Sequence, residues 1–340
     1  MYEKSLLLFI IINIPIVIFY QKIIRKFNIF DTADGIRKLH KKDIPLFGGS
    51  LIVYNIFAFY IINYFIGINS EINFLSTREH FSFFGGIILV YLIGLYDDKF
   101  DLSSTKKLFF NFFIILFIIL VDDNLVIREL SLFFVENNIE LKNISYFFSI
   151  LCVLLFMNAL NMFDGINLQA GFYSLLIFII FIIKDTYSFY SLIIICTLML
   201  FLFYNYQNKS FLGDSGTQVL AFIISYILIK SHNIEKIFSP EEIFIILSFP
   251  GLDMFRLFLL RILNGKNPFH ADIDHIHHLI TKRVSSFYAF LIIFLVILSN
   301  ILVYYIFTNS LLSLSTIILS YFFLFFIFKK GKTKNWNKFL

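Results

Sequence analysis

Three acidic residues lie close together where an apolar run of the chain ends. Asp97 and Asp98 are adjacent, and Asp101 follows three residues later. Grouped carboxylates beside an apolar segment are costly unless a cation or a proton-transfer task stabilises them. Their hard oxygens suit Mg²⁺, and mutual repulsion raises the proton affinity of one member, as a general base near neutral pH requires. The alternative is a helix cap with solvated acids.

Polar side chains recur every three positions in a second segment, at Asn158, Asn161, Asp164 and Asn167. On a helical turn this spacing places amides and a carboxylate along one stripe, which suits hydrogen bonds to a nucleobase, a ribose or sugar hydroxyls. We expect the helix to end at the following glycine. The same stripe could instead join transmembrane helices to one another.

A third segment reads Gly-Asp-Ser-Gly over residues 213–216. It places one carboxylate, Asp214, in a tight turn where a helix starts, and Phe211 lies beside it as a stacking platform. The motif is weak by itself. Because it accompanies the other polar segments, Asp214 is a candidate metal ligand.

Two further segments carry groups that bind anions. Residues 31–49 concentrate positive charge before a Gly-Gly pair where backbone can approach a phosphate, with Arg37, Lys38, His40, Lys41 and Lys42. Residues 261–280 carry a dense group of histidines and aspartates: His270, Asp272, Asp274, His275, His277 and His278. This group predicts zinc binding or phosphate recognition by imidazoles, with Arg256 or Arg261 assisting. Magnesium held by the acids fits all the segments together better than zinc does.

The elements that position these groups are membrane helices. Of the 340 residues, 59% are hydrophobic and only 15% are charged, against roughly 25% charged in soluble proteins. The chain is therefore expected to be an all-α polytopic integral membrane protein in one domain, residues 1–340, with about 10–11 transmembrane helices. Predicted spans lie near 5–21, 48–66, 81–96, 108–121, 144–160, 168–183, 187–204, 216–230, 240–262, 286–306 and 311–328. Pro250 and Gly251 are expected to break or kink the ninth.

The basic residues orient these spans. With eleven spans, 21 of the 28 Lys and Arg residues lie on one side, which the positive-inside rule makes cytoplasmic. The amino terminus is then outside and the carboxyl terminus inside. All five polar segments lie on the cytoplasmic side, in loops 21–47, 97–107, 158–167, 205–215 and 262–284. The two cysteines lie in apolar runs, so no disulfide framework is expected.

In this order, the five segments resemble a known enzyme family. They read IRKLHKKDIPLFGG, GLYDDKFD, NALNMFDGIN, FLGDSG and HADIDHIHHLI. The chain is similar to the polyprenyl-phosphate N-acetylaminosugar-1-phosphate transferases (MraY/WecA type, glycosyltransferase family 4) from about residue 31 to 280. The separated His-Ile-His-His pattern looks more like the enzymes that start O-antigen or teichoic acid synthesis than like the peptidoglycan-precursor enzyme.

The resemblance implies an enzyme of the bacterial inner membrane that moves a sugar 1-phosphate from a UDP-aminosugar to undecaprenyl phosphate and releases UMP. It implies a Mg²⁺ cofactor, with Mn²⁺ as a substitute, membrane lipid around the chain, a homodimer, and no nucleic-acid partner. GlcNAc is the expected sugar. The main alternative is phospho-N-acetylmuramoyl-pentapeptide transfer, and remote ones are a polytopic transporter and an intramembrane zinc hydrolase.

By the same resemblance, residues take roles in catalysis, in metal binding and in substrate binding. The implied catalytic residues are Asp97, Asp98, Lys107, Asp164 and His275. The implied metal ligands are Asp214 and Asp98. The implied substrate-binding residues are Arg37, His40, Asn158, Asn161, Asn167, Phe211, His277 and His278. The chain departs from the family pattern at Asn167, where a second aspartate is common, at Ala33, where a proline is common, and at Asn111, where a glutamine is common.

Overall fold

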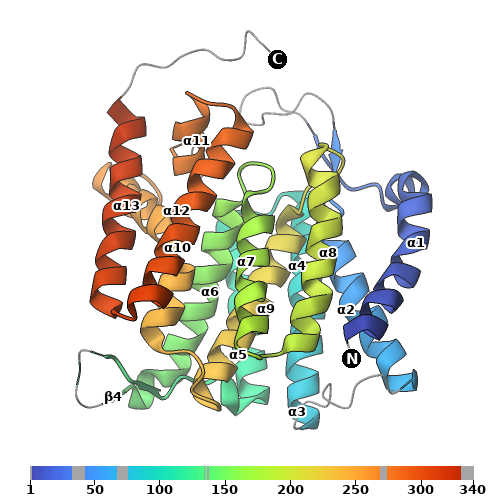
Figure 1. Cartoon of the computed structure of the whole chain (residues 1–340), viewed down its shortest axis with the longest axis horizontal. Helices are drawn as coiled ribbons and strands as arrows, with labels where there is room; N and C mark the ends of the chain where they lie inside the picture. Colours follow the sequence, from blue (N-terminus) through green and yellow to red (C-terminus); the bar gives the residue numbers. More distant parts are fainter. Residues whose placement is uncertain are drawn as a thin grey trace. The chain divides into compact units, whose positions relative to one another are not determined.

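The computed structural model describes residues 2–32, 43–66, 76–133, 135, 138–268 and 274–330. Helices make up nearly all of this, and the strands form two short antiparallel ribbons, β1 with β2 and β3 with β4 (Figure 1). The predicted all-α architecture is confirmed.

The helices and strands have the following bounds: α1 Tyr2–Phe27, β1 Phe30–Asp31, β2 Ile44–Pro45, α2 Gly48–Ile66, α3 Thr77–His80, a π-helical turn Phe81–Gly85, α4 Gly86–Phe100, α5 Ser104–Val121, β3 Glu129–Leu130, β4 Ile139–Glu140, α6 Ser145–Phe163, α7 Gln169–Ile183, α8 Ser188–Tyr206, α9 Gly213–Asn233, α10 Pro240–Leu263, α11 Ile276–Thr281, α12 Ser286–Phe307 and α13 Ser310–Lys330. Short 3₁₀ turns cover Asp123–Leu125 and Lys142–Ile144.

Long apolar helices make this a polytopic membrane protein. Within the described ranges, nine helices are long and apolar enough to cross a bilayer, because about 20 apolar residues at 1.5 Å each match its hydrocarbon thickness. Each of the eleven predicted spans falls on a helix. Two of these helices are not among the nine: α7 is shorter, and α9 carries several polar residues and is buried along nearly its whole length. Helix α10 continues through Pro250 and is not broken there.

The chain forms two compact units that alternate along the sequence. The first comprises residues Met1–Asp123 and Gly171–Ile227, and the second comprises Asn124–Ala170 and Leu228–Leu340. The boundary between them falls inside α9, after Ile227. The expectation of a single domain stays a prediction.

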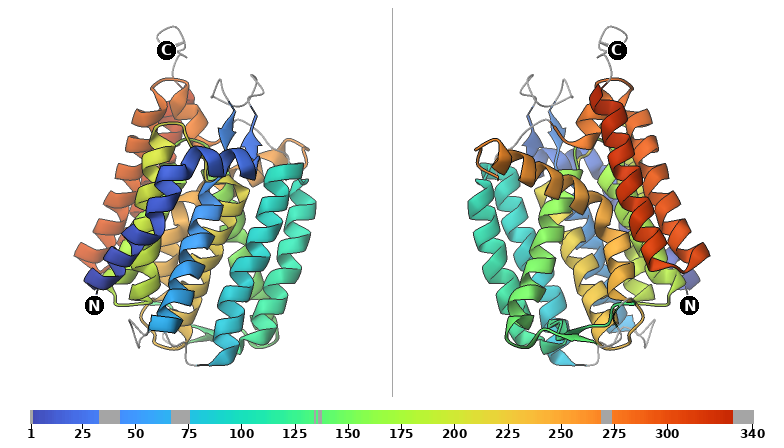
Figure 2. Two further views of the ribbon diagram at one scale, coloured as in Figure 1. Left: turned by 90° about the vertical axis from the view of Figure 1, so that its right-hand side faces the viewer. Right: turned by 90° about the vertical axis from the view of Figure 1, so that its left-hand side faces the viewer.

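In the first unit, α2 packs against α8, and α4 packs against α5 (Figure 2). Polar side chains pair inside these contacts. Asn13 of α1 donates to the Asn55 side-chain oxygen at 2.7 Å, and Asn55 donates back at 3.2 Å. Both residues are buried, and the exchange satisfies amides that an apolar environment would otherwise leave unpaired.

In the second unit, α10 packs against α6 and α13, and α12 and α13 form an antiparallel pair (Figure 1). Asn300 of α12 donates to Ser320 of α13 at 2.9 Å. Arg283, in the turn before α12, donates to the carbonyls of Ile327 and Phe328 in the last turn of α13. These carbonyls have no partner within their own helix, so a cation there also complements the helix dipole.

One close backbone contact in the first unit places α4 against the start of α9. A side-chain carbon built on Gly94 would lie 2.4 Å from the Cα atom of Ser215. Real Cβ atoms do not approach backbone so closely, so only glycine allows the two helices to lie at this distance. The contact lies about one helical turn from Asp97 and Asp98, and it therefore sets how near these carboxylates come to Asp214.

We expect Gly94→Ala to destabilise the protein by about 1–3 kcal/mol, because the added methyl group has no room beside Ser215. Gly251→Ala is the matched control, since it is also helical and nothing lies within 4 Å of the added carbon. Thermal unfolding of both variants in detergent tests this. Equal midpoints for the two variants would contradict the close contact.

Candidate active site

Asp97 closes the turn between α4 and α5. Its Oδ1 atom accepts the backbone N–H of Leu102 at 2.7 Å, just after Asp101 ends α4 in the left-handed conformation, with φ of 49°. Asp97 is only 3% exposed. The turn thus holds one buried carboxylate in a fixed orientation at the carboxyl end of α4.

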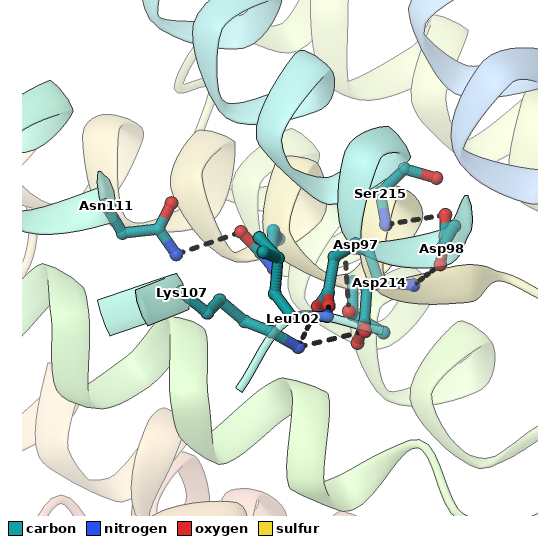
Figure 3. Close-up of polar contacts among 9 residues, drawn as sticks. Asp97, Asp98, Leu102, Lys107, Asn111, Asp214 and Ser215 are labelled. Carbon is teal, nitrogen blue, oxygen red and sulfur yellow. Dashed lines mark hydrogen bonds and ion pairs between the residues drawn. The ribbon is translucent and has the colours of Figure 1, made fainter. Parts of the chain in front are cut away.

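Lys107 connects two acidic residues that are distant in sequence. It lies in the first turns of α5, where its ammonium group forms an ion pair with Asp97 and a second ion pair, at 2.9 Å, with Asp214 of α9 (Figure 3). The Asp214 side chain is 30% exposed, so one end of this group is open. A cation between two carboxylates lowers their mutual repulsion and keeps both in place.

Asp98 caps the amino terminus of α9. Its two carboxylate oxygens accept the backbone N–H groups of Asp214 at 2.6 Å and Ser215 at 3.1 Å (Figure 3). The first N–H groups of a helix lack partners within the helix, and its positive dipole end favours a negative charge. Asp98 therefore has a clear capping role, and its assignment as a metal ligand stays a prediction.

A buried amide pair joins α5 and α9 a second time. Asn111 donates to the Gln218 side-chain oxygen at 2.9 Å (Figure 3). Asn111 and Gln218 each follow the Lys107–Asp214 pair by four residues, so the two contacts lie one turn apart on both helices. Asn111, a departure from the family pattern, thus takes part in holding the site together.

Backbone hydrogen bonds attach Phe211 to the end of the basic loop. Its N–H donates to the Pro45 carbonyl at 2.9 Å, and its own carbonyl accepts the Gly48 N–H at 3.0 Å. β1 and β2 pair on either side of residues 33–42. Arg37 and His40 lie in that stretch, outside the described residues, so their roles stay predictions.

In the second unit, the polar stripe ends α6. Asn158 and Asn161 lie in its last turns, Asp164 follows its last residue, and Asn167 lies in the turn beyond. All four are half-buried. Asn158 donates to the Leu154 carbonyl of its own helix at 2.9 Å. The helix ends at Phe163, two residues before the glycine at which it was expected to end.

The three described histidines of the fifth segment stack together in this unit. His275 and His277 lie nearly parallel, with centroids 5.3 Å apart, and His278 lies 4.3 Å from His277. His277 is 1% exposed and its ring lies directly on Gly165, where a side-chain carbon would be 1.9 Å from Nε2. Burial, with His278 and His275 adding to it, lowers the pKa of His277 well below its usual value. His277 is thus buried against Gly165 with a lowered pKa, and its predicted phosphate contact stays a prediction.

Sequence reasoning missed Asp253, a buried carboxylate in α10. His275 contacts it through Nδ1, at 2.9 Å. A signal was present, because Asp253 and Arg256 are an acid and a base three residues apart in the middle of a largely apolar helix. His270 and Asp272 lie outside the described residues.

Both arginines that the sequence suggested for phosphate binding donate hydrogen bonds to other groups of the protein. Arg256 donates to the Asp253 carboxylate, to the Tyr321 hydroxyl and to the Asp274 carbonyl. Arg261 donates to the Pro268 carbonyl at 2.7 Å. Both are buried, and their contacts hold Pro268 and Asp274, the described residues on either side of residues 269–273.

Comparison with known proteins places the chain in a family. Residues 80–232 match the model of glycosyl transferase family 4. A probable undecaprenyl-phosphate N-acetylglucosaminyl 1-phosphate transferase of Bacillus subtilis (strain 168) is 30% identical over 300 residues, covering 85% of this chain and 79% of that protein. The chain belongs to glycosyl transferase family 4. The undecaprenyl-phosphate alpha-N-acetylglucosaminyl 1-phosphate transferase of Escherichia coli O157:H7 is 28% identical over 284 residues, covering 78% of this chain and 72% of that protein.

The region matched by the family 4 model includes the acidic site. Asp97, Asp98, Lys107 and Asp214 all lie within residues 80–232, as do the polar residues at the end of α6. The histidine cluster lies beyond it. The resemblance noted on five sequence segments is therefore confirmed at the level of the family.

We expect Asp98→Asn to weaken the start of α9 by about 0.5–2 kcal/mol, because the amide has one acceptor oxygen and no charge. Asp101→Asn is the matched control, since asparagine tolerates the left-handed conformation of this exposed position. Hydrogen exchange of the peptide covering residues 213–218 measures the effect. Equal exchange in both variants would show that Asp98 is not the cap.

Proposed function

We propose that this protein transfers an N-acetylaminosugar 1-phosphate from a UDP-sugar to a polyprenyl phosphate, with undecaprenyl phosphate as the acceptor and UMP as the second product. The names of the Bacillus and Escherichia relatives support the acceptor and favour GlcNAc over a muramoyl-pentapeptide as the transferred sugar. The product would start the assembly of a lipid-linked glycan.

The observation that carries the proposal is the position of Lys107 between Asp97 and Asp214. In the reaction, a phosphate oxygen of the lipid forms a bond to the β-phosphorus of the UDP-sugar, and the bond from that phosphorus to the UMP oxygen breaks. The acceptor is already a nucleophile, so the enzyme must mainly align two anions and neutralise their charge. A lysine that is held by two carboxylates from different helices supplies positive charge at a fixed place.

The acids around Lys107 take different parts in this scheme. Asp97 is buried and fixed by Leu102, so it orients the lipid phosphate or accepts its remaining proton. Asp98 holds the amino terminus of α9, whose dipole favours the phosphate groups of the donor. Of the two carboxylates that pair with Lys107, that of Asp214 is the more exposed, so it is the one that faces ligands directly.

The acidic group suits Mg²⁺ as a partial site completed by substrate. Magnesium usually takes one or two protein carboxylates together with substrate phosphates and water. In the described part of the chain, no three His, Cys, Asp or Glu side chains are arranged to hold a metal ion. Asp214 and Asp98 would hold Mg²⁺, with Mn²⁺ as a substitute, and when bound the ion neutralises charge on the diphosphate and on the departing UMP.

We also propose the setting of the reaction. The bacterial relatives support placement in a bacterial inner membrane. Positive charge bias in the sequence supports an amino terminus outside and a carboxyl terminus and active site in the cytoplasm. UDP-sugars are cytoplasmic, which agrees with this orientation. A homodimer remains part of the proposal.

We expect purified protein with undecaprenyl phosphate and Mg²⁺ to release UMP from UDP-GlcNAc. UDP-GalNAc and UDP-MurNAc-pentapeptide, tested in parallel, are expected to release far less. The measurement is UMP formation together with extraction of the lipid product. Release from the pentapeptide donor alone would overturn the sugar assignment, and silence with every donor would overturn the reaction.

We expect Asp214→Asn to lower kcat by about 10²–10³-fold, because the amide weakens both the hold on Lys107 and the interaction with Mg²⁺. Asp101→Asn, which lies outside the Lys107 contacts, is the control and keeps most activity. Initial rates of UMP release across a Mg²⁺ titration test this. Near-wild-type turnover in Asp214→Asn would remove this residue from the site.

A further inference from the structure

Asp253 is a buried charge inside a transmembrane helix, and its two oxygens have different partners. Oδ1 accepts the Tyr321 hydroxyl of α13 at 2.8 Å, the Arg256 guanidinium of α10 at 2.8 Å and the Ile276 backbone N–H of α11 at 3.2 Å. Oδ2 accepts from Nδ1 of His275, at 2.9 Å. The residue is 2% exposed.

Charge balance alone does not account for the Oδ2 contact. A carboxylate and a guanidinium form a neutral pair, and the Tyr321 hydroxyl and the Ile276 N–H supply further hydrogen bonds to the same oxygen. The hydrogen bonds that stabilise the buried charge therefore all reach Oδ1. Among the described residues, Oδ2 is bonded only to the imidazole, so we infer that this oxygen serves to orient His275.

The contact with Asp253 determines which nitrogen of His275 is available. An ionised carboxylate only accepts hydrogen bonds, so Nδ1 must carry the proton and Nε2 is left for another partner. The Ile276 N–H bond fixes the backbone next to the ring, and stacking on His277 at an interplanar angle of 9° fixes its tilt. The side chain of His275 is 10% exposed, so the ring is held on nearly all sides.

We propose that Asp253 is a positioning residue that holds His275 with a protonated Nδ1, so that the unprotonated Nε2 atom is presented as a hydrogen-bond acceptor to a hydroxyl group of the substrate. The identity of the ligand rests on the proposed function. The orientation of the imidazole does not, because it follows from contacts within the second unit. Removing Asp253 is expected to release the ring and to change its tautomer.

The first test reads the protonation of the ring directly. Protein labelled with ¹⁵N at its seven histidines is placed in lipid nanodiscs, and His275→Gln identifies the His275 signals. We expect a proton on Nδ1 in the wild type and the Nε2-protonated tautomer in Asp253→Asn. A wild-type ring without a proton on Nδ1, or an unchanged ring in the variant, would overturn the proposal.

Two further variants separate this effect from a general loss of structure. Glu242→Gln is the matched control, since Glu242 is also a buried acid of α10 but contacts Tyr305 at 2.6 Å. We expect it to leave the His275 signals unchanged. Asp253→Asn leaves Arg256 buried without its carboxylate and could fail to fold. The double variant Asp253→Asn/Arg256→Gln removes both charges, and the same change of tautomer is expected in it.

The second test asks whether Asp253 acts through His275. We expect Asp253→Asn, or the double variant, to lower kcat/KM for the UDP-sugar by about 10–100-fold, as removal of an outer hydrogen-bond partner commonly does. In a His275→Gln background the same change is expected to cost less than about threefold, because residues that act as a unit are not additive. Additive losses would overturn the proposal. If the wild type shows no UMP release, the reaction proposal fails and the histidine signals still decide the role of Asp253.

Discussion

The ion pairs of Lys107 are the interaction on which the acidic site depends. Asp97 and Asp214 come from helices that are far apart in sequence, and without a cation between them their charges would repel in a poorly hydrated place. The lysine joins α4, α5 and α9 at one point. The Gly94 contact and the Asn111–Gln218 pair hold the same helices close together around it.

The same constraint recurs at several polar groups that lie among apolar helices. Asn13 pairs with Asn55, Asn300 with Ser320, and Asp253 with Arg256, Tyr321 and His275. Unpaired polar groups are expensive in an apolar medium, so a partner on the same or a neighbouring helix stabilises these residues. Because the hydrophobic effect does not drive helices together inside a bilayer, these contacts and close glycine packing select which helices meet.

The two acids of the adjacent pair have distinct environments. Asp97 faces the α4–α5 turn and Lys107, whereas Asp98 faces the amino terminus of α9. Consecutive residues of a helix point about 100° apart, so neighbours in sequence reach different elements. From the sequence alone, Asp97 and Asp98 form one acidic group, and their contacts cannot be separated.

Length, apolar periodicity and charge bias determined the class of protein, and all eleven predicted spans fall on helices. Motif order was enough to indicate the family, because it depends on residue types and spacing alone. Tertiary structure decided the partners: that Lys107 bridges Asp97 and Asp214, that Asp98 caps α9, that His277 is buried on Gly165, and that Asp253 orients His275. These contacts join residues up to 117 positions apart. No local pattern encodes them, since they depend on which helix faces which after packing.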